Sequence, residues 1–485
     1  MSAGTVFAPL LGALRGGATL SGEHIAEFTL PVPGDMRRRL ATGWLLLALS
    51  ALVGSGLFSV LLVLARTPGL QRLFPVADFF HVALVVHVDL SVLVWFSAFA
   101  GMLWTLSSRP RYPALAGAAL ALAALGAIVM AAAPFLGQGA PVMSNYVPVL
   151  DDGVFLYGLS LFGAGFGLLI VRHLLAPGHF GIGLDGEGAL RFGLNASVVA
   201  AAIALIALAW SWAGMPAGLS GKPYYELLFW GGGHAIQFTW TLLMLVAWLW
   251  LATLVGAPLP LSPRLAVLLF AIALASVFAV PLIYLTWNVA SIEHQRLHTW
   301  LMRFGGGLAI LPVGLAVLIG LARASPGTAA TRPLQAALIS SLALFALGGL
   351  IGFLIRGSDV RIPAHYHGSI VGVTLALMGL AYALLPRLGF GTPQGRLAVL
   401  QPYLYAGGQL AHIVGLVWSG GYGVQRKVAG SEQVLKSAQE VFGMGLMGLG
   451  GLVAVAGGVL FLIVMFRALL ERRSRGPEQI RCAAW

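Results

Sequence analysis

Long apolar runs alternate with short segments rich in Pro, Gly and charged residues along the chain. Each run is about 20 residues or longer, the length an α-helix needs to cross the hydrocarbon core of a bilayer. The predicted spans are 42–65, 80–107, 113–136, 153–172, 192–213, 225–255, 265–288, 299–322, 333–355, 365–386, 398–420 and 438–470. The pattern therefore predicts an all-α integral membrane protein with about 12 transmembrane helices.

The composition agrees with this fold class. Of the 485 residues, 59% are hydrophobic and 9% are charged, against about 25% charged residues in soluble domains. A large soluble domain is excluded. We expect a cytoplasmic N-terminal segment at 1–40, a membrane domain at 41–471 and a cytoplasmic basic tail at 472–485.

The net charge of +12 comes from 28 Lys and Arg residues that lie mainly in the connections between spans. Basic residues are enriched on the side of the N-terminal run 37–39 and the C-terminal cluster 472–475. By the positive-inside rule, both termini are predicted to be cytoplasmic. No nucleic-acid-binding motif accompanies the charge, so we expect no nucleic-acid partner.

Cysteine usage restricts the chemistry of any metal site. Cys482 is the single cysteine of the chain, which excludes a disulfide framework, a CxxCH heme attachment and a paired-thiolate metal cluster. Any metal must therefore be held by His or by oxygen ligands.

Eleven histidines stand out in so apolar a chain. His24, His173 and His179 fall in predicted loops, and we expect them to be exposed to solvent. His87 and His234 instead lie in the first third of predicted spans, where a polar imidazole costs free energy unless it is paired or ligates something.

A further pair, His365 and His367, stands where the span 365–386 begins. Two residues on an α-helix are separated by about 200° of rotation, so the two rings point to opposite sides and suit two separate cofactors better than one metal. A pair of interfacial histidines is the alternative. With His87 and His234, they are predicted at similar depth in the outer half of the membrane.

This arrangement resembles subunit I of the heme-copper oxidase superfamily, which includes oxygen reductases and nitric oxide reductases. The resemblance extends over nearly all the predicted spans. It implies that His87 and His367 bind a low-spin heme axially, that His365 binds a high-spin heme, and that His234 occupies the helix-six position of a copper ligand.

A basic pair also matches the family. Arg426 and Lys427 lie in the outer loop after the span 398–420, where the family has cations facing heme propionates. Charge pairing with two carboxylates needs such residues. An ordinary loop charge pair is the alternative.

The copper site departs from the family pattern. Phe238 stands where many oxygen reductases have a tyrosine cross-linked to the helix-six histidine, but Tyr284 resembles the tyrosine that C-type oxygen reductases place on helix seven. Ala290 and Ser291 replace the family's His-His pair. This pattern indicates that the usual copper pair is lost.

Nearby histidines could restore a second metal site. His294 and His298 are four residues apart and share one face if the segment is helical. A displaced metal site and a loop with surface histidines are both compatible with this spacing, and the surface loop is favoured. Gln237, Glu293 and Asp89 are polar groups near the expected heme level, where they could relay protons or bind a metal other than copper.

The resemblance implies the catalytic subunit of a respiratory gas reductase in a bacterial inner membrane. Its cofactors would be two hemes, with type b favoured over type a, and copper or another second metal stays open. The gas is dioxygen or nitric oxide, and the electron donor is another subunit, a cytochrome c or a cupredoxin. The expected catalytic residues are His365, His234, Tyr284 and Gln237. A non-catalytic electron-transfer relative and a polytopic transporter are the alternatives.

Overall fold

The computed structural model describes residues 27–69, 77–137, 139–179, 184–355, 357–428 and 433–471. The helices are α2 (Met36–Arg66), α3 (Ala77–Val88), the π-helix η2 (Asp89–Val94), α4 (Trp95–Ser107), α5 (Pro113–Leu136), α6 (Gly153–Leu175), α7 (Gly186–Ala213), α8 (Gly221–Leu254), α9 (Pro263–Val277), α10 (Ala279–Thr286), α11 (Ile292–Gly305), α12 (Gly307–Arg323), α13 (Arg332–Leu354), α14 (Arg361–Leu384), α15 (Arg396–Gly421) and α16 (Ala438–Leu470). Outside the described residues lie His24, the tail 472–485 and Cys482.

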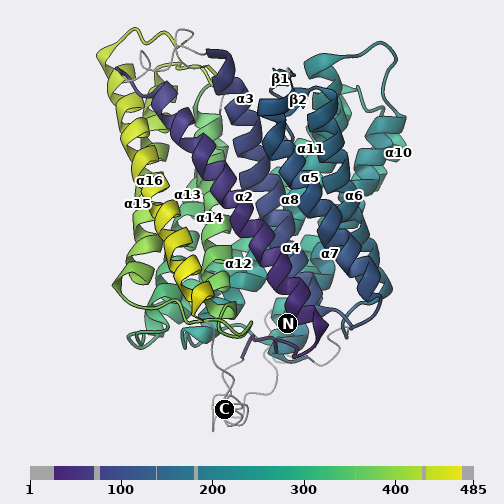
Figure 1. Ribbon diagram of the computed structural model, residues 1–485, viewed down its shortest axis with the longest axis vertical. Helices are drawn as coiled ribbons and strands as arrows, with labels where there is room; N and C mark the ends of the chain where they lie inside the picture. The colour runs from purple at the N-terminus through teal and green to yellow at the C-terminus, as the bar shows by residue number, and fades with distance from the viewer. Residues whose placement is uncertain are drawn as a thin grey trace, which may run out of the picture.

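All the predicted apolar runs are helical, and the molecule is a multi-pass membrane bundle (Figure 1). In the described residues, 11 helices or continuous helix stretches are long and apolar enough to cross a membrane. The remaining predicted span is α15, a helix of 26 residues. Its buried Gln401, Gln409 and His412 make it more polar than its neighbours.

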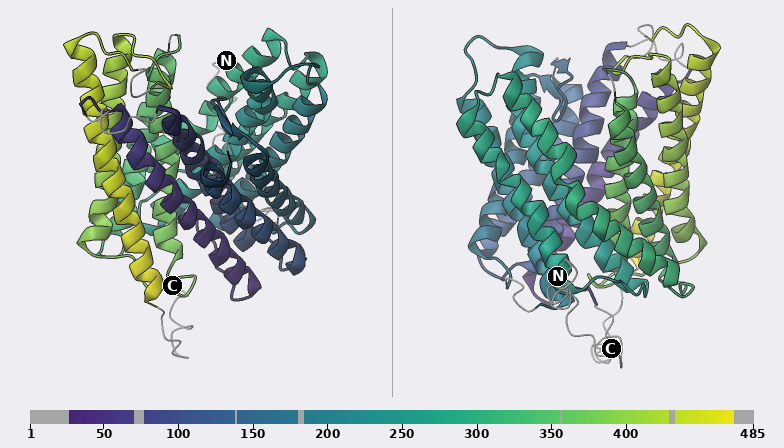
Figure 2. Two further views of the ribbon diagram at one scale, coloured as in Figure 1. Left: turned by 45° about the horizontal axis from the view of Figure 1, so that its top comes forward. Right: turned by 180° about the vertical axis from the view of Figure 1, so that it is seen from behind.

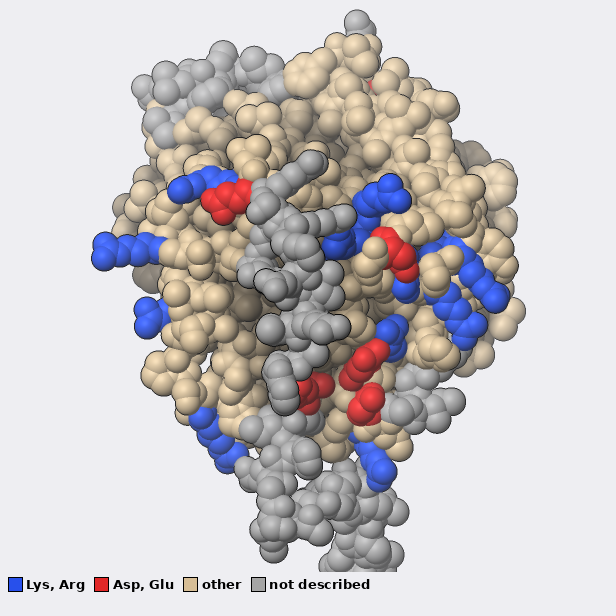
Figure 3. Space-filling view, turned by 60° about the horizontal axis from the view of Figure 1, so that its bottom comes forward, with Lys and Arg blue, Asp and Glu red and all other residues tan. Residues whose placement is uncertain are grey.

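The two ends of the bundle differ. Helix α2 begins and α16 ends at the same end, which we call the terminal end (Figure 1). Figure 3 shows Lys and Arg side chains spread over this face. At the opposite end, an antiparallel hairpin joins β1 (Ala140–Val142) to β2 (Val149–Asp151), with Pro141 opposite Leu150.

Glycines allow α15 and α16 to pack backbone against backbone at one side of the bundle (Figure 2). A Cβ on Gly408 would lie 2.3 Å from the Ala454 nitrogen, and one on Gly450 would lie 2.3 Å from the His412 nitrogen. Small residues permit this close approach between membrane helices. The packing fixes the face of α15 that carries the polar side chains.

Two helices occupy the centre of the bundle. Helices α8 and α14 are the most buried of the candidate membrane spans. They carry His234 and the His365–His367 pair, so three of the predicted ligands lie on the most enclosed elements of the fold, while His87 lies on α3.

Candidate functional site

The two histidines at the start of α14 contact different helices. The Nδ1 atom of His365 lies 2.7 Å from the carbonyl oxygen of Gly348 on α13. The Nδ1 atom of His367 lies 3.1 Å from Oε1 of Gln409 on α15. The two-residue spacing thus directs the rings toward separate surroundings.

Three imidazoles lie together at the C-terminal end of α3: those of His87, His367 and His412. We call this group the α14 cluster. The rings of His367 and His412 lie 4.5 Å apart, and His87 is close enough to His367 to interact with it electrostatically. His87 and His412, which are 325 residues apart in the sequence, are therefore brought together around His367.

Acceptor oxygens set the tautomers of these rings. The Nδ1 atom of His87 lies 2.9 Å from the Ser55 hydroxyl, which donates to the His87 carbonyl oxygen, and 3.1 Å from the Ser55 carbonyl oxygen. The Nδ1 atom of His412 lies 2.9 Å from the Met447 carbonyl oxygen. A carbonyl oxygen only accepts, so Nδ1 carries the hydrogen and Nε2 carries the lone pair. The same reasoning applies to His365 and His367.

The free nitrogen of each ring has the character of a metal ligand. Among the described residues, none hydrogen-bonds Nε2 of His87, His365, His367 or His412. A histidine that ligates a metal typically donates its other N–H to a carbonyl or carboxylate. These four rings meet that condition.

The helix carrying His87 changes its winding directly after this residue. The π-helix η2 begins at Asp89, which is buried and has no hydrogen-bond partner for either carboxyl oxygen. Short π segments inside α-helices often mark functional sites. Burying a carboxyl group without a hydrogen-bond partner destabilises the folded state. Asp89 therefore lowers stability at a position two residues from the predicted heme ligand His87.

A second group of imidazoles lies between α8 and α11, the α11 cluster: His234, His294 and His298. The rings of His294 and His298 are 4.4 Å apart, and that of His298 is 6.0 Å from His234. Both nitrogens of His294 and Nε2 of His298 are buried without a hydrogen-bond partner.

Nδ1 of His298 lies 2.8 Å from the His294 carbonyl oxygen. The expectation of a surface loop for this pair is wrong. The side chains of His294 and His298 lie on a helix, α11, and are fully buried. The polar segment packs its two histidines against α8, and the exposed Glu293 occupies the other face.

In contrast to its partners, His234 has both ring nitrogens engaged. Its Nδ1 lies 2.7 Å from the Trp230 carbonyl oxygen and its Nε2 lies 2.8 Å from the Tyr146 hydroxyl. Because Nδ1 donates to the carbonyl, the hydroxyl donates to Nε2. Burial raises the pKa of Tyr146 well above its usual range, against a hydrogen bond from Gln237 that lowers it.

Two of the three glycines before His234 make room for two tyrosines. A Cβ on Gly233 would lie 2.2 Å from the Tyr146 ring, and one on Gly231 would lie 2.0 Å from the Tyr284 hydroxyl. Neither distance is compatible with a side chain. The Gly-Gly-Gly-His motif therefore lets residues from the β1–β2 connection and from α10 approach the α11 cluster.

Tyr284 faces the α11 cluster. Its ring lies 4.7 Å from that of His294 and 5.4 Å from that of His298. Its hydroxyl shares a hydrogen bond of 2.7 Å with the Ser211 hydroxyl. The structure thus places a phenol beside the imidazoles that carry the unpartnered nitrogens.

The basic pair lies over the β1–β2 connection at the end opposite the termini. Arg426 lies 3.3 Å from Oδ1 of Asn145, and Lys427 Nζ donates to the Met143 carbonyl oxygen at 2.7 Å. Burial and the adjacent Arg426 lower the pKa of Lys427 to about 8, while Glu226 opposes this shift.

Other polar residues differ from expectation or were missed by it. His173 is buried on α6, with its ring nitrogens beside the Trp104 carbonyl oxygen and Asn195 Oδ1, so its predicted exposure is wrong. His179 is exposed, as expected. The sequence analysis did not identify Tyr146 or His412 as site residues. A signal for His412 was present, because His412 and Gln409 are two polar residues three positions apart within an apolar run.

The described side chains do not form a ready metal cage. No group of three His, Cys, Asp or Glu side chains within the described ranges is arranged to hold one metal ion. In the α11 cluster, His234 is turned toward Tyr146 and away from shared ligation. The histidines are gathered but not all oriented toward one point.

Comparison with known proteins identifies relatives. No family model matches the chain. It is 28% identical to an uncharacterized protein of Rickettsia prowazekii (strain Madrid E), in an alignment covering 88% of this chain and 95% of that protein. It is 31% identical to an uncharacterized protein of Aquifex aeolicus (strain VF5), over 74% of this chain and 88% of that protein. The chain therefore belongs to the same family as the Aquifex aeolicus protein.

Proposed function

We propose that this chain is the catalytic subunit of a membrane-bound gas reductase of the heme-copper oxidase type. One observation carries the proposal: the imidazoles of His87, His365 and His367 each bind an oxygen through Nδ1 and have Nε2 without a partner among the described residues. Heme iron is held by neutral histidine nitrogens of this kind.

The low-spin heme would be held by His87 and His367, which come from α3 and α14. Held by two imidazoles, this heme would carry electrons, whereas a heme held by one imidazole would react with a gas. His365, whose hydrogen bond leads to α13 instead, would hold the high-spin heme. When bound, the hemes would supply electron storage and the iron at which the gas reacts. We favour heme b over heme a.

A second metal would have to use the α11 cluster. The unpartnered nitrogens of His294 and His298 fit this role, because each buried unsatisfied nitrogen costs about 1–3 kcal/mol. His234 fits only after its Nε2 is released by the Tyr146 hydroxyl. The second metal is therefore assigned to His294 and His298, with His234 as a conditional third ligand.

The chain's own hydroxyl and amide groups would serve proton transfer beside these ligands. Tyr284 and Tyr146 hold protons next to His294 and His234, and Gln237 hydrogen-bonds Tyr146. Reduction of dioxygen to water takes four electrons and four protons, whereas coupling of two nitric oxide molecules takes two of each. Both gases remain substrates of the proposal.

The basic face at the terminal end supports the orientation of the protein in the membrane. Lys and Arg side chains on this face (Figure 3) favour its placement in the cytoplasm of a bacterial plasma membrane. The end carrying Arg426 and Lys427 would then face outward. An external cytochrome c, cupredoxin or donor subunit would deliver electrons there.

The activity is tested by measuring consumption of dioxygen and of nitric oxide by detergent-purified protein with an artificial one-electron donor. We expect turnover with one of the gases. His365→Ala should abolish it, and His179→Ala, which alters an exposed histidine, should not. Equal turnover by both variants would contradict the proposal.

A second candidate function is supported by the hydrogen bond between Tyr146 and His234. If that bond persists, the α11 cluster lacks its third ligand and the chain transfers electrons between hemes without reducing a gas. A protein that contains two hemes but consumes neither gas would establish this candidate and exclude the reductase.

A further inference from the structure

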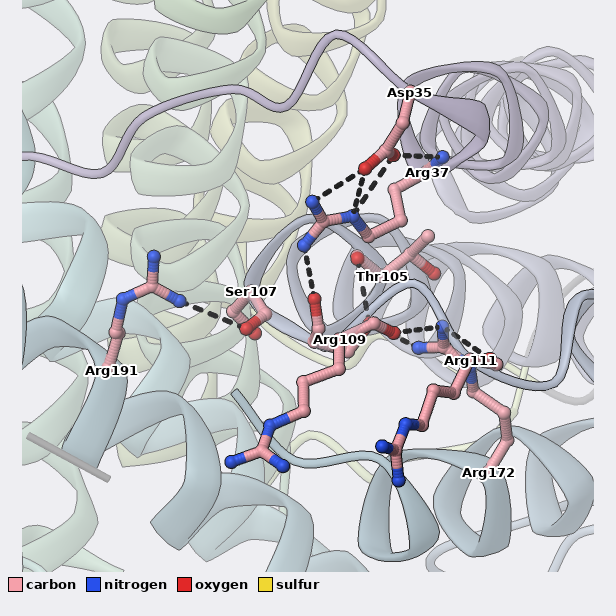
Figure 4. A network of polar contacts seen from close by, with 9 residues as sticks. Asp35, Arg37, Thr105, Ser107, Arg109, Arg111, Arg172 and Arg191 are labelled. Atoms are coloured by element: carbon pink, nitrogen blue, oxygen red, sulfur yellow. Dashed lines mark hydrogen bonds and ion pairs between the residues drawn. The ribbon is translucent and has the colours of Figure 1, made fainter. Parts of the chain in front are cut away.

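A pocket of about 340 Å³ opens at the terminal end of the bundle, the volume of about ten water molecules. Its lining includes four arginines on three elements: Arg37 at the start of α2, Arg109 and Arg111 in the α4–α5 connection, and Arg191 on α7. Figure 4 shows the side chains. So many cations around one hollow predict an anionic ligand.

A fifth arginine fixes the shape of the pocket. Arg172 on α6 is buried and donates to the carbonyl oxygens of Arg109 and Arg111, at 2.8 and 3.1 Å, and to the Ser108 hydroxyl. The backbone of the α4–α5 connection is thereby tied to α6. The Arg109 and Arg111 side chains are left to extend from this anchored loop (Figure 4).

Two of the arginines are already paired. Arg37 forms an ion pair of 2.7 Å with Asp35, and Arg191 forms one of 2.8 Å with Glu187. Arg37 also donates to the Ser108 carbonyl oxygen, and Arg191 donates to that of Ser107. These four contacts hold both guanidinium groups at the rim.

The remaining charge is uncompensated. The exposed side chains of Arg109 and Arg111 have no acidic or hydrogen-bonding partner among the described residues. The pocket lining thus has two guanidinium groups without a counter-charge, and arginine binds phosphate through paired N–H donors.

Exposed apolar side chains adjoin the segments that form the pocket, and the end of α6 is joined to the α4–α5 connection by a hydrogen bond from the Arg109 nitrogen to the Ala176 carbonyl oxygen. Leu174 and Leu175, at the end of α6, are 49% and 55% exposed, and Tyr112, beside Arg111, is 48% exposed. A phosphate in the pocket would thus lie at the boundary between polar end and apolar flank. This is the environment of a lipid headgroup with its acyl chains on the helices.

We propose that this pocket binds the phosphate headgroup of an anionic phospholipid. Arg109 and Arg111 contact the phosphate, Arg37 and Arg191 border it, and Arg172 positions the loop. The acyl chains lie along the exposed end of α6. This site is separate from the heme sites, so it stands whether or not the gas reductase proposal holds.

The test measures phosphatidylglycerol bound to delipidated, detergent-purified full-length protein by native mass spectrometry, with phosphatidylcholine and inorganic phosphate as further probes. The double variant Arg109→Gln/Arg111→Gln is compared with Arg323→Gln/Arg396→Gln. The control removes two exposed arginines outside the pocket, with the same change in charge. Thermal melting in the same detergent checks that both variants fold.

We expect the affinity for phosphatidylglycerol to fall about 30-fold in the pocket variant, because each of the two basic residues contributes about 1 kcal/mol near a lipid headgroup, and to stay unchanged in the control. Phosphatidylcholine should bind weakly to all three proteins, and inorganic phosphate should not displace phosphatidylglycerol. Equal affinities in the two variants would overturn the proposal. If inorganic phosphate displaces phosphatidylglycerol, the ligand of the pocket is a soluble phosphate compound and the lipid proposal is wrong.

Discussion

The α14 cluster and the α11 cluster contain three imidazoles each, but they are prepared for ligation to different degrees. In the α14 cluster, His87 and His412 bind backbone carbonyl oxygens through Nδ1, and His367 binds Gln409. In the α11 cluster, His234 has both nitrogens occupied and His294 has neither. A ring whose Nδ1–H donates to an oxygen has its Nε2 lone pair available for a metal. Burial of a ring without such a hydrogen bond does not select this tautomer.

The largest expected effect is the loss of an entire heme from the prepared cluster. His367→Ala should remove one of two hemes per chain, because it deletes an axial ligand. His412→Ala should keep both, although its ring lies 4.5 Å from His367. Heme per chain in each purified variant is measured from a pyridine hemochrome spectrum. Loss of one heme from His412→Ala but not from His367→Ala would identify His412 as the ligand instead.

The next effect concerns the second metal. His298→Ala should lower the affinity of the α11 cluster for that metal at least about 100-fold, by analogy with the cost of disturbing a metal site, while leaving both hemes in place. Elemental analysis gives metal and iron per chain. A chain that contains no metal besides heme iron, before and after the substitution, would exclude the α11 cluster as a metal site.

Removing the Tyr146 hydroxyl, which occupies Nε2 of His234, should raise the affinity for the second metal. Tyr146→Phe removes the hydroxyl that donates to Nε2, so affinity for the second metal should rise about two- to tenfold, the worth of one hydrogen bond. Competition with a chelator of known affinity measures the change. Gly233→Ala, which displaces the same ring, is a matched variant and should act in the same direction. Unchanged affinity in both would show that His234 takes no part in ligation.

The smallest effect is on the pH dependence of the low-spin heme potential. Burial lowers the pKa of Lys427 to about 8, so its positive charge is present below that pH and is lost as pH rises through it. A nearby positive charge stabilises the reduced heme. The midpoint potential should therefore fall between neutral and alkaline pH in the wild type.

Lys427→Arg provides the control for this measurement. Arginine keeps its charge throughout the range, so the potential of this variant should stay high and change less with pH. A potential that falls equally in both proteins would assign the pH dependence to another group.

The helices were predictable because apolar runs bounded by Pro, Gly and charge determine them directly. The bounds of Pro113–Leu136 agree to the residue with the predicted span. The burial of His294 and His298 was not predictable, since the segment is locally polar and its packing against α8 decides its environment. Likewise His173 is stabilised by Asn195 and Trp104, which are distant in sequence.

The helices that carry the candidate ligands could be predicted from the sequence, but the orientation of their rings could not. His87, His234, His365 and His367 were named from their depth in the spans and from the family resemblance. Hydrogen bonds to Ser55, Gly348 and Gln409 decide which nitrogen is free, and no local pattern predicts them. The insertion of Tyr146 beside His234 depends on the β1–β2 connection folding over α8, which sequence spacing does not reveal.

The most direct test of the central claim is the heme content of the purified wild-type protein beside the His87→Ala variant. A reduced-minus-oxidised spectrum is combined with iron counts, each normalised to protein. The account predicts two b-type hemes in the wild type and one in the variant, with the low-spin signal lost. A wild-type protein without iron would contradict the account.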